Sequence, residues 1–279
     1  MTATQAHSAT PTTAVSVQEL KRAWRAIEAG EFRSPPSSSL VGGERSRHAW
    51  ASVERVLTVV GCIGSSGATT LALALASAAE GPSRVIECCT PTASGLASAP
   101  TEELGPHDSG WSRGTRGDVL LERGTRTLGT ADALPAPVEP DRAQALTVLD
   151  VGWELGQLLA GQGWLRDHVI RADHVVVTTT ATIPGLRRLE GTLSLLTGSS
   201  ATAAVLGPIR RKWPRGLEHS LGSLTRQLDQ RDAIHGIPYD HALAVRGLDS
   251  TPLPAPLLSA ADLILRATVA GPTTKDTPS

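Results

Sequence analysis

Several kinds of residue are scarce in this 279-residue sequence, and each shortage narrows what the protein can be. One Tyr, one Phe and six Trp leave Ala, Leu and Val to build the core that a hydrophobic content of 40% allows. Lysine is rare, and the formal net charge is −1. This balance excludes a strongly basic protein that coats nucleic acid through bulk charge.

Cysteine is also scarce, and its pattern indicates no metal site. Cys62, Cys88 and Cys89 lack metal-ligand spacing, and two adjacent cysteines are a poor disulfide pair. The first 14 residues lack the pattern of a secretory signal, so a reducing cytoplasm is the expected setting. No apolar run reaches the roughly 18 residues of a membrane-spanning helix. We therefore predict a cytoplasmic protein, and the scattered histidines do not suggest a metalloenzyme.

The N-terminal part of the sequence divides into a tail, a helix and a linker. Residues 1–15 are predicted to be a disordered tail, and residues 33–52 form a Pro/Ser/Gly-rich linker. Residues 16–32 predict an amphipathic helix. Such a tethered helix can dock into a protein partner's groove or pack back on its own domain, and both remain open. Its apolar, partner-binding side would include Leu20, Trp24 and Ile27.

The main body, residues 53–269, predicts a doubly wound α/β fold with a mostly parallel sheet between two layers of helices. Residues 90–118 are rich in Gly, Pro, Ser and Thr and predict a loop, and the role of residues 90–145 stays open. The polar, proline-broken tail 270–279 argues against membrane insertion. Expected strands are 56–60, 84–88, 146–151, 175–179 and 203–206, and expected helices are 70–79, 184–196, 217–229 and 255–267.

The most informative segment joins the first expected strand to the first expected helix. Residues 59–70 read VVGCIGSSGATT, which is the setting of a phosphate-cradling P-loop. Gly64 and Gly67 keep the P-loop spacing, while Thr69 and Thr70 keep the hydroxyl positions. Such a loop binds phosphate because backbone N–H groups at a helix N-terminus point at the ligand.

Two positions of this loop depart from the P-loop pattern. Ala68 stands where the phosphate-binding lysine belongs, and Cys62 replaces the first glycine. These residues alone leave two alternatives equally open. The segment is either a phosphate-binding loop that has lost its main charge or an ordinary glycine-rich turn that binds nothing.

Three segments together resemble the MinD/ParA family of deviant P-loop ATPases. Residues 61–70 align with the family's GKGGxGKTT loop. Residues 172–179 (ADHVVVTT) are similar to its ADxVVVVTT strand, and Pro184 and Leu186-Arg187-Arg188 follow as the family's proline and helix do. Residues 237–243 (IPYDHAL) are similar to its IPYDPAL segment beside the nucleotide base. Order and spacing agree over residues 53–269, so the resemblance implies a P-loop NTPase-like fold.

The resemblance also implies cofactors and the residues that hold them. ATP and Mg²⁺ are the expected ligands, with Thr69 and Asp150 as metal ligands, directly or through water. The resemblance leaves a homodimer possible. The implied nucleotide-binding residues are Gly64, Ser65, Ser66, Gly67, Ala68, Thr69, Thr70 and Pro238.

The departures from the family pattern concern catalysis. The family's two loop lysines correspond to Ala68 and Ile63, and its acid near the attacking water corresponds to Cys89. Phosphoryl transfer depends on positioning and charge neutralisation, so these losses predict little hydrolysis. No catalytic residue is assigned. We expect a catalytically weak or inactive adaptor in positioning, partition or DNA-transfer machinery.

Two alternatives to the inactive adaptor remain. The first is a working ATPase that uses an arginine in place of the lysine, with Arg84 and Arg210 as candidates. The second is an interaction module that does not use nucleotide. A basic cluster, Arg210, Arg211, Lys212 and Trp213, could make weak DNA contacts with the indole stacked on a base, or could be a solvated loop.

Overall fold

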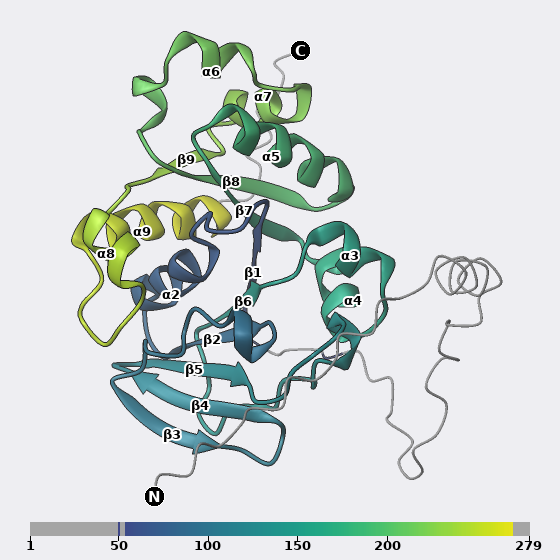
Figure 1. Cartoon of the computed structure of the whole chain (residues 1–279), viewed down its shortest axis with the longest axis vertical. Coiled ribbons are helices and arrows are strands. Elements are labelled where there is room, and N and C mark those ends of the chain that lie inside the picture. Colours follow the sequence, from purple (N-terminus) through teal and green to yellow (C-terminus); the bar gives the residue numbers. More distant parts are fainter. Residues whose placement is uncertain (1–49, 51–53, 270–279) are drawn as a thin grey trace, which may run out of the picture. The chain divides into compact units, whose positions relative to one another are not determined.

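The structure is a computed structural model that describes Trp50 and residues 54–269 (Figure 1). The predicted tail 1–15, helix 16–32 with Leu20, Trp24 and Ile27, most of the linker 33–52, and the tail 270–279 lie outside these residues. Within the described part of the chain, no helix has the length and apolar character needed to cross a membrane.

One nine-stranded sheet runs through the described residues in the order β3-β4-β5-β2-β6-β1-β7-β8-β9. Neighbouring strands from β5 to β9 are parallel, whereas β4 is antiparallel to both β3 and β5. The strands are β1 (Val56–Gly61), β2 (Ser83–Cys88), β3 (Glu102–Pro106), β4 (Trp111–Arg116), β5 (Val119–Gly124), β6 (Leu146–Val151), β7 (His174–Thr180), β8 (Ser200–Leu206) and β9 (Ile234–Ile237).

Helices cover both faces of this sheet, which confirms the predicted three-layer α/β fold. One face carries α2 (Ala68–Ala78) and α9 (Ala255–Val269), which pack against each other. The other face carries α3 (Leu155–Ala160), α4 (Trp164–Arg171), α5 (Ile183–Leu195), α6 (Arg215–His219) and α7 (Ser223–Gln230). The short α8 (His241–Arg246) precedes α9.

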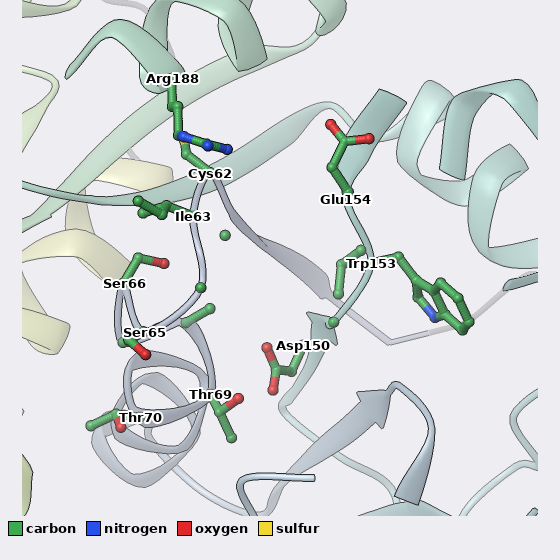
Figure 2. A pocket seen from close by; sticks show the side chains of 16 residues that line it. Cys62, Ile63, Ser65, Ser66, Thr69, Thr70, Asp150, Trp153, Glu154 and Arg188 are labelled. Carbon is green, nitrogen blue, oxygen red and sulfur yellow. The ribbon is translucent and has the colours of Figure 1, made fainter. Parts of the chain in front are cut away.

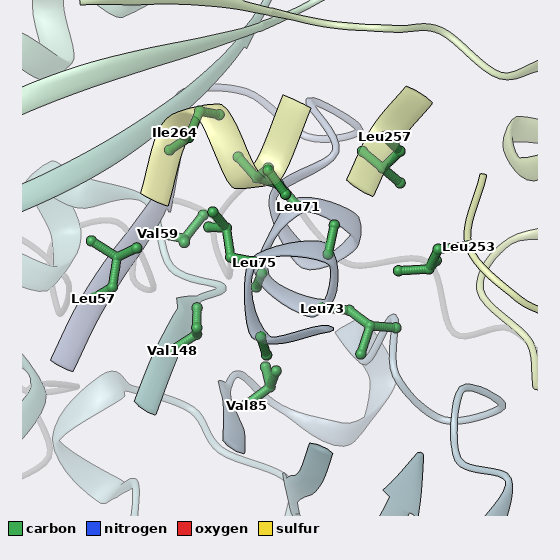
Figure 3. Close-up of a cluster of buried hydrophobic side chains, with 14 of the residues drawn as sticks. Leu57, Val59, Leu71, Leu73, Leu75, Val85, Val148, Leu253, Leu257 and Ile264 are labelled. Carbon is green, nitrogen blue, oxygen red and sulfur yellow. The ribbon is translucent and has the colours of Figure 1, made fainter. Parts of the chain in front are cut away.

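The central strands contribute buried side chains to two hydrophobic clusters, one on each face of the sheet. Val59 faces the cluster under α2 and α9, while Val60 faces the cluster under α3 to α7, because successive strand side chains point to opposite faces. In Figure 3, Leu71 and Leu75 of α2 lie between the sheet and α9. All residues from Leu71 to Ala76 are buried, so α2 is enclosed on every side. The N-terminus of α2 is therefore held at a fixed place beside β1.

The predicted loop over residues 90–118 was wrong, because two strands of the sheet, β3 and β4, lie in this region and β5 follows directly after it. Trp111 of β4 and Leu121 of the following β5 are fully buried. Gly114 lets β4 pass close to Pro100, since a Cβ at this glycine would come within 2.8 Å of the proline side chain. Gly117, at φ +57°, turns the chain between β4 and β5. The many glycines thus serve close packing and a tight turn.

The predicted single helix over residues 217–229 was also wrong. The chain instead forms α6 and α7, separated near Gly222. The Glu190 carboxylate from α5 accepts hydrogen bonds from the backbone N–H groups of Leu224 and Thr225, at 2.8 and 2.9 Å, and so caps the start of α7. A side chain distant in sequence therefore fixes this boundary.

Candidate functional site

The glycine-rich loop lies where three parallel strands end. It follows β1, and its first residues are bonded to the end of β7: the Cys62 N–H donates to the Thr178 carbonyl at 2.9 Å. The hydroxyls of Ser66 and Thr178 are hydrogen-bonded at 2.8 Å in a buried position. The carboxyl ends of parallel strands are where ligands bind in such sheets.

The loop has the backbone conformation of an anion-binding turn. Ser65 (φ 60°) and Gly67 (φ 82°) both adopt left-handed conformations, which is uncommon for a residue other than glycine. Helix α2 begins at Ala68, and no acidic residue occupies its first turn. Within the described part of the chain, the backbone N–H groups of Gly67, Ala68 and Thr69 have no acceptor. Free donors at the positive end of a helix dipole favour an anion.

A cavity of about 410 Å³ opens above the loop (Figure 2). It brings together the predicted loop residues and the predicted metal ligand Asp150, which comes from the end of β6. The predicted base-side residue Pro238 lies outside it. Pro238 lines a neighbouring cavity of about 500 Å³ that shares Ser65, Gly67 and Thr70 with the first. The first cavity is lined by residues 61–70 and 150–154 and by Arg188.

Asp150 is the most perturbed acid of this cavity. Only 2% of it is exposed, and burial raises its pKa to about 7, with the neighbouring Glu87 carboxylate adding to the rise. A hydrogen bond from Thr69 acts in the opposite direction. Thr69 and Asp150 therefore lie together at the N-terminal start of α2, as a hydroxyl and a carboxylate oxygen that suit Mg²⁺. A bound cation would favour the ionised carboxylate.

Glu87, at the end of β2, is already held by the chain that follows it. Its carboxylate accepts hydrogen bonds from the Ser94 hydroxyl (2.5 Å) and from the Gly95 N–H (2.6 Å). Gly95 packs directly on Thr69, because a Cβ there would lie 2.9 Å from the threonine methyl group. Burial raises the Glu87 pKa as well. This acid thus organises the turn beside Thr69.

Cys62, which lines the cavity, and Cys89, which does not, supply no acid or base near neutral pH. Cys89 is buried, and burial raises its pKa to about 12, so its thiol stays protonated. Burial raises the pKa of Cys62 to about 11, although a hydrogen bond with Thr192 and the charge of Arg188 oppose this. Neither thiol can therefore act as a carboxylate would.

The two arginines that the sequence offered as lysine substitutes are engaged elsewhere, and neither lines the cavity. Arg84 is 1% exposed and pairs with Glu54 and Glu122. Arg210 pairs with Glu218 at 3.0 Å and with Asp229 at 2.8 Å. The structure contradicts the proposal that either one replaces the lysine.

The structure bears on one member of the predicted nucleic-acid cluster, Trp213. Trp213 is 7% exposed, its indole N–H donates to the Pro208 carbonyl at 2.9 Å, and the Arg210 guanidinium lies 4.7 Å from its ring centre. The ring therefore has no free face on which a base could stack. Arg211 and Lys212 remain exposed on the short turn after β8.

The same cavity is lined by further residues to which the sequence assigned no site role, among them Trp153, Glu154 and Arg188. Glu154 also caps α3, since its carboxylate accepts from the Gln157 N–H at 2.8 Å. Figure 2 shows the Arg188 side chain above Cys62, across the cavity from Glu154. The sequence signal for Arg188 was only its place after the 172–179 segment.

No protein-family model matches the sequence, and no curated protein matches it either. Solved structures that it resembles include plasmid partition proteins, a cell division ATPase and a cobyrinic acid a,c-diamide synthase, at low identity over most of the chain. A plasmid partition protein from Borrelia burgdorferi shares 13% identity, with 78% of this chain and 98% of that chain covered and a TM-score of 0.49.

Two further neighbours have similar values. The cell division ATPase MinD from Pyrococcus furiosus shares 14% identity, covers 77% of this chain and 99% of its own, and has a TM-score of 0.42. Cobyrinic acid a,c-diamide synthase from Mycobacterium smegmatis, solved with an ATP analogue and magnesium, shares 13% identity, covers 78% and 94%, and has a TM-score of 0.44.

Proposed function

We propose that this chain is a MinD/ParA-like nucleotide-binding protein whose loop holds Mg·ATP or Mg·ADP but hydrolyses ATP slowly or not at all. The observation that carries the proposal is the loop itself. Gly67 has a left-handed backbone, and the N–H groups of Gly67, Ala68 and Thr69 have no acceptor among the described residues, so they can bind phosphate. The Thr69 hydroxyl and the Asp150 carboxylate can bind Mg²⁺ beside the same cavity of about 410 Å³.

Weak catalysis follows from the groups that the site lacks. Ala68 cannot neutralise charge on the transferred phosphoryl group, and the Cys89 thiol cannot orient or activate water as a carboxylate does. Losing one donor of this kind costs about 10²–10³ in rate. Nucleotide binding depends less on these groups, because backbone N–H groups and Mg²⁺ can supply much of it.

As an adaptor, the protein would work through its contacts. The helix 16–32, with Leu20, Trp24 and Ile27, stays our proposal for the protein-partner site, and a homodimer stays possible. A weak DNA contact would use the exposed Arg211 and Lys212, with Arg210 and Trp213 shaping the turn that presents them. The role in positioning, partition or DNA transfer rests on the resemblance of the three sequence segments.

Phosphate release by the full chain tests the catalytic half of the proposal. With Mg·ATP, we expect turnover near background and the same value for Thr69→Ala, with Thr69→Ser as the matched variant that keeps the hydroxyl. A clear Mg²⁺-dependent rate that Thr69→Ala abolishes and Thr69→Ser retains would show an active ATPase instead.

A further inference from the structure

We infer that Arg188 supplies the phosphate-binding cation that the loop sequence lacks. This inference rests on the proposed nucleotide site and assigns a residue to its phosphate contact. The ligand group is the β- or γ-phosphate of a nucleoside di- or triphosphate. The guanidinium would reach this phosphate from α5, on the β7 side of the cavity, and not from the N-terminus of α2.

The packing of α5 fixes where Arg188 lies. Leu186 and Leu189 are fully buried against the sheet and anchor this part of the helix. Cys62 packs against the hydrophobic cluster that includes Leu189. Thr192, one turn after Arg188, acts to lower the pKa of the Cys62 thiol. This side of α5 therefore lies beside the first residue after β1. The charge of Arg188 acts on the same thiol. The guanidinium is therefore close to the loop, as Figure 2 also shows.

Among the described residues, Arg188 is the positively charged group nearest to hand for a phosphate in this cavity, as the charges of the lining residues show. Of the residues that line the cavity in the described part of the chain, Arg188 is the one cation, whereas Asp150 and Glu154 are acids. Arg188 is exposed and makes no ion pair with any described residue. Its five N–H donors are thus available to phosphate oxygens, with which a guanidinium forms bidentate bonds.

The arginines that are engaged elsewhere make a useful contrast. Arg84 donates to Thr147, to the Val138 carbonyl and to Glu122, and Arg210 is held by two carboxylates. Each has its guanidinium occupied by the fold. Arg188 is held by the fold only through its backbone and helix, which leaves the side chain free to meet a ligand.

Calorimetric titration of the full chain with Mg·ATP, Mg·ADP and AMP tests the inference. We expect Arg188→Ala to weaken Mg·ATP and Mg·ADP binding by about 10- to 100-fold, the value of one charge-assisted hydrogen bond to phosphate. AMP binding should change by less than about threefold, since AMP lacks the outer phosphates. Arg188→Lys should restore part of the loss, because it keeps the charge without the bidentate fork.

Arg187→Ala is the matched control, since Arg187 is exposed on the same helix and does not line the cavity. It should bind all three nucleotides as the unaltered chain does. If Arg188→Ala binds Mg·ATP within about twofold of the unaltered chain, or if Arg187→Ala loses as much affinity, the inference is wrong while the nucleotide site stands. If the unaltered chain binds no nucleotide, the proposed function fails and the inference fails with it.

Discussion

Replacing Asp150 with asparagine should change how the stability of the protein depends on pH. The carboxyl is buried at the end of β6, and its pKa is about 7 in the folded chain, against an ordinary value of 3.8. Between these two pH values the folded protein keeps a proton that the unfolded chain has released. Raising the pH through this window therefore lowers the free energy of unfolding.

The size of the effect follows from the same two values. The difference between pKa 3.8 and about 7 corresponds to a loss of roughly 4 kcal/mol in the free energy of unfolding. The whole loss applies above pH 7, and none of it applies below about pH 4. Asp150→Asn removes the buried charge and keeps an oxygen that accepts from Thr69. Without Mg²⁺ or nucleotide, we expect this variant to match the unaltered chain near pH 4.5. It should be more stable by several kcal/mol at pH 8.

Urea unfolding followed by circular dichroism, from pH 4.5 to pH 8.5, measures this difference. Glu87 stays in both proteins, and burial raises its pKa too, so the burial of Glu87 is common to both curves. The difference between the curves reports the Asp150 charge together with its repulsion of Glu87. Two stability curves that remain parallel over the whole range would refute the account of Asp150 as a buried acid that ionises near neutral pH.

Three further substitutions test other parts of the account. Arg84→Met should lower the free energy of unfolding by about 3–5 kcal/mol, because it removes a partner of the fully buried Glu122; chemical unfolding measures this. Gly152→Ala should cost about 1–3 kcal/mol in the same assay, since the new Cβ would lie 2.5 Å from the Cβ of Cys89. Ala68→Lys should tighten Mg·ATP binding about 10-fold or more in calorimetry, since it restores a cation at the loop.

Two control substitutions of the same residue types show whether the loss of stability depends on the buried position or on any change of an arginine or a glycine. Arg142→Ala removes an exposed ion pair with Asp118 and should cost less than about 1 kcal/mol. Gly191→Ala places a methyl group in open space on α5 and should stabilise by about 0.5–1 kcal/mol. If Arg142→Ala costs as much as Arg84→Met, or if Gly152→Ala behaves like Gly191→Ala, the corresponding explanation is wrong.

Much of the central architecture could be predicted because its signals are local. The apolar run at residues 146–151 became β6 with the same bounds, and its final acid marked Asp150 as a site residue. Glycine spacing at Gly64 and Gly67 pointed to the loop, and the left-handed backbone of Gly67 at the helix start is one that favours glycine. Those features depend on a few adjacent residues.

Features that depend on distant packing could not be predicted in this way. The strands β3 to β5 alternate weakly and carry glycines that only their close neighbours explain, such as Gly114 beside Pro100. Trp213 stands among basic residues that suggest a solvated turn, yet the fold buries it. Arg188 reaches the cavity only because α5 packs beside β7 and against Cys62, which sequence spacing does not reveal.

Calorimetric titration of the unaltered full chain with ATP, with and without Mg²⁺, tests the central claim most directly. We expect Mg²⁺-dependent binding in the micromolar range, about −8 kcal/mol at 1 μM, that Thr69→Ala abolishes. No binding at millimolar nucleotide in the presence of Mg²⁺ would contradict it, and the loop would then be a glycine-rich turn that holds no phosphate.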